Sequence, residues 1–104
     1  MKLFELFIAN ISWDSGSKCR PVLVLQITGN TVSVFPITTQ YRNKSKTIQA
    51  HYFKIDEWQQ AGLDKQSYID TGMVLDLPLS VFIKKKPIGK LTTADKQRLL
   101  KFLE

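Results

Sequence analysis

Polar residues that could act on a bound anion stand at the ends of two apolar runs. Arg20 comes directly before residues 21–27 (PVLVLQI), and Thr38 and Thr39 come directly after residues 31–37 (TVSVFPI). Strand ends next to loops are places where side chains can face a groove, so these residues are the first candidates for a site. The structural alternatives are that Arg20 pairs with a surface carboxylate and that Thr38 ends its strand by bonding local backbone groups.

Other kinds of catalytic site lack the residues that they need. His51 is the single histidine and Cys19 the single cysteine, so neither a metal site nor a disulfide is expected. A glycine-rich phosphate loop, a GxSxG elbow and an HExxH motif are all absent from the sequence. We therefore expect a site that uses no metal and no cofactor, and a packing or surface role for His51.

The chain is strongly basic, with 15 Lys and Arg against nine Asp and Glu and a formal net charge of +6. Arg42, Lys44 and Lys46 alternate in a polar stretch, and residues 84–86 are three consecutive lysines. Such clusters can neutralise phosphates and make binding to a polyanion salt-dependent. Basic runs also occur as solvated surface that only aids solubility, so charge alone does not decide between these roles.

The length of 104 residues corresponds to one domain, which we expect to cover residues 1–104. No apolar run is long enough to span a bilayer, and the first five residues lack the zones of a signal peptide. We therefore expect a cytoplasmic protein that does not contact a membrane.

Short apolar runs separated by turn residues predict a mainly β domain. A polar loop is expected at residues 10–18 and a hairpin turn at residues 28–30, and Pro36 indicates an edge strand or a strand end. The expected strands are residues 3–9, 21–27, 31–37, 47–53, 67–70, 73–77 and 79–84.

Two helices complete the predicted fold. A short helix is expected at residues 54–62, capped by Asp56 and ended by Gly62. A terminal helix should begin after Thr92, within a Thr-x-x-Asp capping box, and continue to about residue 103. The result is a small β-barrel crossed by a helix whose apolar face is made by Ala94, Leu99, Leu100 and Leu103.

Four segments, in order along the chain, resemble the MazF/PemK family of toxins. Residues 17–25 (SKCRPVLVL) are similar to the family's KxRPVLVL signature, and residues 34–39 (VFPITT) to its vxPiT segment. The other two are residues 61–70, with AGL followed by SYID, and residues 88–92 (IGKLT). Each fragment alone is a weak match, and the four together span almost the whole chain.

The resemblance implies an SH3-like small β-barrel with a C-terminal helix, a homodimer and metal-independent cleavage of single-stranded RNA. In that chemistry the ribose 2′-hydroxyl attacks the adjacent phosphate and leaves 2′,3′-cyclic phosphate and 5′-hydroxyl ends. Arg20 matches the family's catalytic arginine and Thr38 its catalytic threonine. Asp70 matches an aspartate of the Kid-like members, and Tyr68 stands where those members have an arginine.

The resemblance also implies an RNA groove and a protein partner. A cognate antitoxin should cover the basic groove with an acidic tail that is initially disordered. We expect RNA contacts from the loops at residues 10–18, 39–47 and 64–67, where Trp13 can stack on a base. The candidate RNA-binding residues are Trp13, Ser15, Lys18, Thr39, Gln40, Arg42, Lys44, Lys46 and Ser67.

Two other functions are compatible with a small basic barrel. CcdB-like proteins use the same barrel to inhibit DNA gyrase by contact, but they would have no use for the pair Arg20 and Thr38. A non-catalytic RNA-binding barrel fits the net charge, and the spacing of the motifs argues against it.

Overall fold

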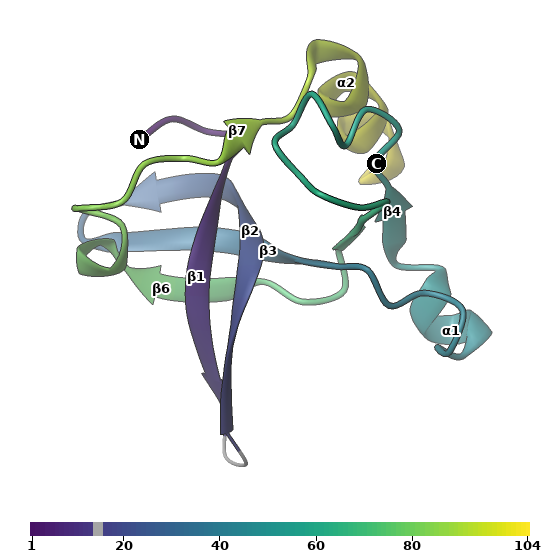
Figure 1. The fold of residues 1–104 in the computed structure, drawn as a ribbon, viewed down its shortest axis with the longest axis horizontal. Coiled ribbons are helices and arrows are strands. Elements are labelled where there is room, and N and C mark those ends of the chain that lie inside the picture. The colour runs from purple at the N-terminus through teal and green to yellow at the C-terminus, as the bar shows by residue number, and fades with distance from the viewer. Residues whose placement is uncertain (14–15) are drawn as a thin grey trace.

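The computed structural model describes residues 1–13 and 16–104, which form one curled, seven-stranded antiparallel sheet. Figure 1 shows α2 at the end of the molecule opposite the one where β1 ends and β2 begins. No helix in the described residues is long and apolar enough to cross a membrane. The elements are β1 (Glu5–Trp13), β2 (Gly16–Thr28), β3 (Thr31–Thr38), α1 (Lys46–Gln49), β4 (Tyr52–Lys54), β5 (Tyr68–Asp70), β6 (Leu75–Pro78), the 3-10 helix η1 (Leu79–Val81), β7 (Gly89–Lys90) and α2 (Thr93–Phe102).

Strand β3 lies in the middle of the sheet, whose order is β4-β5-β3-β2-β1-β7. One side of β3 pairs with β2, and the other side pairs first with β6, through Thr31–Val34, and then with β5, through Ile37 and Thr38. Of the two alternatives predicted for Pro36, the edge strand is therefore wrong, and Pro36 lies two residues before the end of β3. Proline has no N–H to donate to a strand ladder, and Pro36 lies at the junction where β3 changes partner from β6 to β5.

Apolar side chains cover both faces of β2 and β3. Successive side chains of a strand point to opposite faces, so the runs at residues 22–25 and 34–37 supply two separate cores. The first core includes Leu23, Ile37 and Leu99 of α2. The second core includes Val22 and Val34 and packs against side chains of β6 and η1. Coverage of both faces explains why these strands are continuously apolar.

Within the predicted loop at residues 10–18, residues 10–13 and 16–18 instead continue two strands, and the remaining two positions lie outside the described residues. Pairing between β1 and β2 runs from Leu6↔Leu23 out to Trp13↔Gly16. The polar composition misled the prediction because this part of the hairpin extends beyond the cores, where a strand needs no apolar side chains. The turn predicted at residues 28–30 is confirmed, with Gly29 at a φ of 57°.

The strand predicted at residues 47–53 is wrong in its first half, which forms helix α1. Ser45 caps this helix by accepting a hydrogen bond from the Ile48 N–H at 3.3 Å, and β4 begins only at Tyr52. The strand predicted at residues 79–84 is also wrong, because a 3-10 turn occupies residues 79–81 and places Phe82 in the second core. At residues 47–49 the helix cap overrode the tendency to form a strand. At residues 79–82 the packing of Phe82 did so.

Residues 56–62 form consecutive turns rather than the predicted helix. The cap expected from Asp56 is absent, although Gly62 does adopt the expected positive φ, at 92°. A Cβ atom on Gly62 would lie 2.1 Å from the carbonyl oxygen of Ile88. This turn is therefore packed backbone to backbone against the segment that leads into β7.

The terminal helix is confirmed, and its cap is the predicted one. The Thr92 hydroxyl accepts a hydrogen bond from the Asp95 N–H at 3.2 Å. Of the predicted apolar face, Leu99 is buried, but Leu100 and Leu103 are 47% and 43% exposed. Helix α2 therefore docks on the barrel through a narrower stripe than the sequence predicted.

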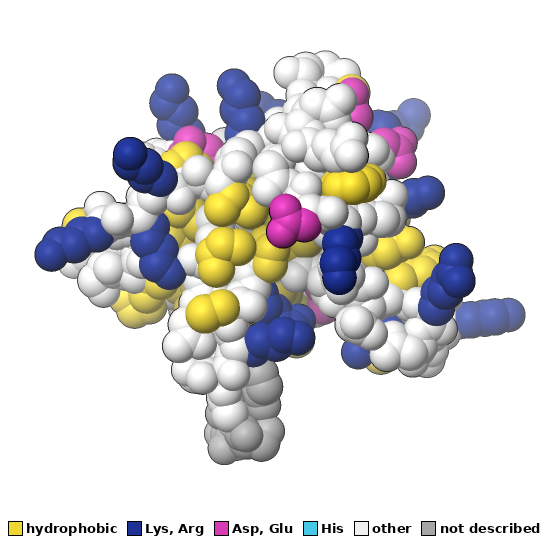
Figure 2. All heavy atoms as spheres, viewed as in Figure 1, with side chains coloured by type: hydrophobic (Ala, Val, Ile, Leu, Met, Phe, Trp, Pro, Cys, Tyr) yellow, Lys and Arg dark blue, Asp and Glu magenta, His cyan; other side chains and the backbone are white. Residues whose placement is uncertain are grey.

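Figure 2 shows hydrophobic side chains gathered over β1 at the centre of one face, with Lys and Arg side chains placed around its margin. Ile8 of β1 is 38% exposed. It lies in a groove with Pro21, Leu63 and Ile88.

A buried carboxylate ties α2 to the turn that follows β4. Asp95 is 1% exposed and accepts hydrogen bonds from the backbone N–H groups of Asp56, at 3.3 Å, and Glu57, at 2.8 Å. Arg98 donates to the same carboxylate at 2.5 Å. The carboxylate thus satisfies backbone donors from a segment 38 residues away in sequence.

We predict that Asp95→Ala lowers the free energy of unfolding by about 2–4 kcal/mol, because it leaves buried N–H groups without an acceptor. Asp56→Ala is the matched control, since Asp56 contacts the same arginine at 3.4 Å but has a side chain that is 55% exposed. The Asp56→Ala control should lower the free energy of unfolding by less than about 1 kcal/mol. Urea unfolding followed by tryptophan fluorescence measures both values, and equal losses would contradict the role assigned to Asp95.

Candidate functional site

The second core opens at one end into a polar pocket. Arg20 lies two residues before the buried Val22, and Thr38 lies two residues after the buried Pro36, so both point to the same face as this core. Val22 pairs with Pro36 across β2 and β3. Continuing this register by two residues places Arg20 opposite Thr38, and the spacing noted in the sequence therefore brings the two side chains together.

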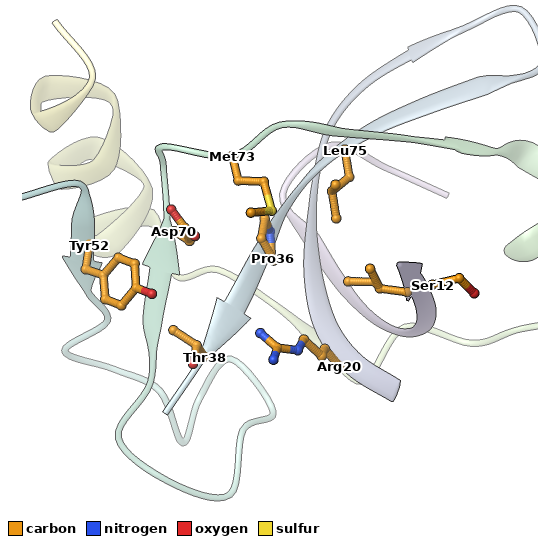
Figure 3. A pocket seen from close by; sticks show the side chains of 9 residues that line it. Ser12, Arg20, Pro36, Thr38, Tyr52, Asp70, Met73 and Leu75 are labelled. Carbon is orange, nitrogen blue, oxygen red and sulfur yellow. The ribbon is translucent and has the colours of Figure 1, made fainter. Parts of the chain in front are cut away.

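Five strands contribute polar side chains to this pocket, and one of these side chains is Ser12 of β1. Arg20 comes from β2, Thr38 from β3, Tyr52 from β4 and Asp70 from β5, and Figure 3 shows them directed toward one space. The cavity has a volume of about 300 Å³. Its lining residues are Ile11, Ser12, Arg20, Pro36, Thr38, Tyr52, Asp70, Met73 and Leu75. We call this space the Arg20 pocket.

Arg20 keeps its donors available to an anion. Its side chain is half-buried, and within residues 1–13 and 16–104 it forms no salt bridge with a carboxylate. The alternative that Arg20 pairs with a surface carboxylate therefore receives no support in the described part of the chain. A planar guanidinium can bind a phosphate through two parallel hydrogen bonds.

Thr38 bonds to local backbone, as the structural alternative proposed, and still lines the pocket. Its hydroxyl oxygen accepts a hydrogen bond from the Gln40 N–H at 3.0 Å. A hydroxyl has one donor as well as two acceptor positions. The bond to Gln40 orients the side chain and leaves the hydroxyl proton to be donated elsewhere.

Asp70 is held by the turn that follows β5. Its Oδ1 atom accepts a hydrogen bond from the Gly72 N–H at 3.0 Å. A Cβ atom on residue 72 would lie 3.3 Å from that oxygen, so glycine lets the backbone approach the carboxylate closely. This contact fixes the orientation of the carboxylate beside the pocket.

Tyr52 is a site residue that the sequence analysis did not find. Burial raises the pKa of its phenol, the negative charge of Asp70 raises this pKa further, and the positive charge of Arg20 acts in the opposite direction. Tyr52 is the Cα partner of Asp70 across β4 and β5. A correct strand boundary at Tyr52 would have provided the signal, because cross-strand partners point to the same face.

Two shallower hollows continue from the Arg20 pocket along the segment after β3. Lys18, Thr39 and Gln40 line the first with Arg20 and Thr38, and Thr39, Gln40 and Arg42 line the second with Tyr41 and Tyr68. The structure thus brings four of the predicted RNA-binding residues next to the pocket: Lys18, Thr39, Gln40 and Arg42.

The other predicted RNA-binding residues are placed differently. Lys44 and Lys46 line none of these hollows, and Lys46 is exposed on α1. Ser67 lines the first hollow but is 3% exposed, and its hydroxyl donates a hydrogen bond to the Lys65 carbonyl at 2.9 Å. Ser15 lies outside the described residues, and so does the side chain of Trp13.

Three tyrosines form an aromatic cluster beside the pocket. The rings of Tyr41 and Tyr68 are stacked at 4.5 Å, with 12° between their planes. The ring of Tyr52 lies 6.2 Å from Tyr41 and 6.5 Å from Tyr68. The cluster packs against the Tyr52 ring at the edge of the pocket.

The fold is that of a small SH3-like barrel with a C-terminal helix, as the sequence predicted. A family model described as "PemK-like, MazF-like toxin of type II toxin-antitoxin system" matches residues 2–104, so the chain belongs to this family. The family resemblance stated from the four sequence segments is therefore confirmed. Membership also implies an antitoxin partner.

A solved structure is similar over nearly the whole chain. It is the Mycobacterium tuberculosis toxin MazF-mt6, with a TM-score of 0.70 and 24% sequence identity. The match covers 95% of this chain and 91% of that chain. At this identity the likeness concerns the fold. No curated protein sequence matches the chain.

Proposed function

We propose that this toxin is a metal-independent endoribonuclease that cleaves single-stranded RNA, including mRNA, by attack of a ribose 2′-hydroxyl on the adjacent phosphate. The products would carry 2′,3′-cyclic phosphate and 5′-hydroxyl ends. The observation that carries the proposal is the meeting of Arg20, Thr38 and Asp70 in one pocket, from three different strands.

Each of the three residues has a role that suits its chemistry. Arg20 holds the scissile phosphate and offsets the charge that builds on its oxygens, and Thr38 donates a hydrogen bond to the same group. Asp70 accepts the proton of the 2′-hydroxyl, as a carboxylate can do when it lies within hydrogen-bond reach. These roles divide the reaction among groups that the strand register places side by side.

The two hollows beyond the pocket offer a path for the flanking nucleotides. Lys18 and Arg42 supply positive charge along it, and Thr39 and Gln40 supply hydrogen-bonding groups. The antitoxin inhibits in this proposal by laying an acidic segment over the same basic path. A homodimer, expected from the family, would bury the apolar groove of Ile8, Pro21, Leu63 and Ile88.

The purified protein is expected to cut unstructured RNA in the presence of EDTA. Arg20→Ala should lower the single-turnover rate by about 10²–10³-fold, because it removes a preorganised donor to the phosphate. Lys101→Ala, in α2 and outside the lining of the pocket and of the two hollows, removes the same charge and should leave the rate unchanged. Product ends are identified by mass spectrometry.

Either of two outcomes of this assay would contradict the proposal and identify a different function. Several unrelated RNA sequences left intact while DNA gyrase is inhibited would identify a CcdB-like toxin. RNA that is bound and left uncut by the wild-type protein would identify a non-catalytic RNA-binding barrel.

Binding to RNA should weaken with salt, and Arg42 should account for part of the dependence. In an Arg20→Ala background, which prevents cutting, Arg42→Ala is expected to reduce the slope of log K against log salt by about 0.7. Lys101→Ala in the same background should keep the slope. Fluorescence anisotropy with a labelled oligoribonucleotide gives these slopes, and an unchanged slope for Arg42→Ala would remove Arg42 from the RNA path.

The dimer is tested by placing a charge in the apolar groove. Ile8→Lys is expected to shift the protein toward monomer, because dimerisation would take the new ammonium group out of water. Ile27→Lys is the matched control, since Ile8 and Ile27 are both 38% exposed on neighbouring strands. Sedimentation velocity distinguishes the two, and a wild-type protein that sediments as a monomer would contradict the dimer.

A further inference from the structure

We propose that Tyr52 is the general acid of the cleavage reaction and that its hydroxyl protonates the 5′-oxygen as this atom leaves phosphorus. This inference rests on the proposed endoribonuclease function and adds a residue to it. Attack by the 2′-oxygen produces an alkoxide at the 5′-carbon unless a proton arrives as the bond breaks. A group that supplies this proton must lie beside the phosphate site and must be distinct from the base.

The position of Tyr52 meets this requirement. Tyr52 and Asp70 are Cα partners in antiparallel strands, which places their Cβ atoms about 4.5–5.5 Å apart on one face of the sheet. Figure 3 shows the Tyr52 hydroxyl directed toward the space between Asp70 and Thr38, with the Arg20 guanidinium on the far side of Thr38. The stacked pair of Tyr41 and Tyr68 holds the ring in this direction.

The other residues that line the pocket do not suit the role. Arg20 stays protonated throughout, and Asp70 is already assigned to the 2′-hydroxyl. The hydroxyls of Ser12 and Thr38 are far weaker acids than a phenol, and the remaining four lining side chains have no proton to give. His51, the single histidine, is exposed and does not line the pocket.

The surroundings of Tyr52 keep its proton in place until it is needed. Burial and the charge of Asp70 raise the pKa of the phenol, so it is fully protonated near pH 7. The positive charge of Arg20 opposes this effect and stabilises the phenolate that forms as the proton leaves. The pocket therefore favours the phenol before the reaction and tolerates the phenolate after it.

The protons of the step balance within the pair of Tyr52 and Asp70. The 2′-hydroxyl gives its proton to Asp70 while the 2′-oxygen forms a bond to phosphorus. The bond from phosphorus to the 5′-oxygen breaks with its electron pair on that oxygen, which takes the proton of Tyr52. Transfer of the proton from Asp70 to the Tyr52 phenolate then restores both side chains.

The test compares two oligonucleotides, each with a single cleavable linkage. The oxygen substrate has the natural bridging 5′-oxygen at this linkage, and the sulfur substrate has a 5′-sulfur in its place. A thiolate with a pKa of about 8.5 leaves without protonation, so the sulfur substrate needs no general acid. Tyr52→Phe should cut the oxygen substrate about 10²–10³-fold more slowly than wild type and the sulfur substrate at a rate within about threefold of it. Thr31→Val removes a hydroxyl at the other end of β3, from a residue that lines neither the Arg20 pocket nor the two hollows, and should keep the wild-type ratio of the two rates.

Thermal unfolding of each variant confirms that the barrel is intact. Equal losses on both substrates for Tyr52→Phe, or no loss on either, would overturn the assignment of Tyr52 as the acid. Wild-type protein that cuts neither substrate gives a different result, because it rejects the endoribonuclease and this inference together.

Discussion

Strand β3 hydrogen-bonds to three other strands, and the Arg20 pocket depends on this pairing. The pocket forms where β3 changes its partner on one side from β6 to β5. The first half of β3 pairs with β6 and the end of its second half with β5, while β2 pairs with the opposite side from Thr31 to Pro36. The sheet must open where β6 and β5 diverge, and Pro36 lies at this opening. The second core fills the opening as far as Val34, and polar side chains occupy the space beyond it.

Contacts far from the pocket hold its outer wall. Tyr52 and Asp70 belong to three-residue strands, which have too few ladder bonds to be stable alone. The turn after β4 is fixed at one end by the Asp95 carboxylate and at the other by the close approach of Gly62 to Ile88. Helix α2 therefore contributes to the geometry of the pocket although none of its residues lines it.

The sequence predicted the parts of the fold that depend on neighbouring residues. Apolar runs located β2 and β3, and the Thr92 cap located α2, because each signal lies within a few positions. The family resemblance indicated Arg20, Thr38 and Asp70. The sequence did not predict β4 correctly, because the Ser45 cap and the cross-strand pairing to β5 compete with the alternating pattern at residues 47–53. Tyr52 was missed for the same reason, since its position depends on register with a strand 16 residues later.

The pocket and the segment after β3 are stabilised by different contacts. Arg20 and Thr38 belong to strands whose register is fixed. A shift of one residue would move the side chains of both cores to the opposite faces of the sheet. Residues 39–45 follow β3 as a connection outside the sheet, where Tyr41 packs in the tyrosine cluster and exchanges at the exposed positions disturb few contacts. Lineages that share this barrel can therefore change the length and composition of the connection while the reactive groups stay in place, so that new preferences evolve without a new active site.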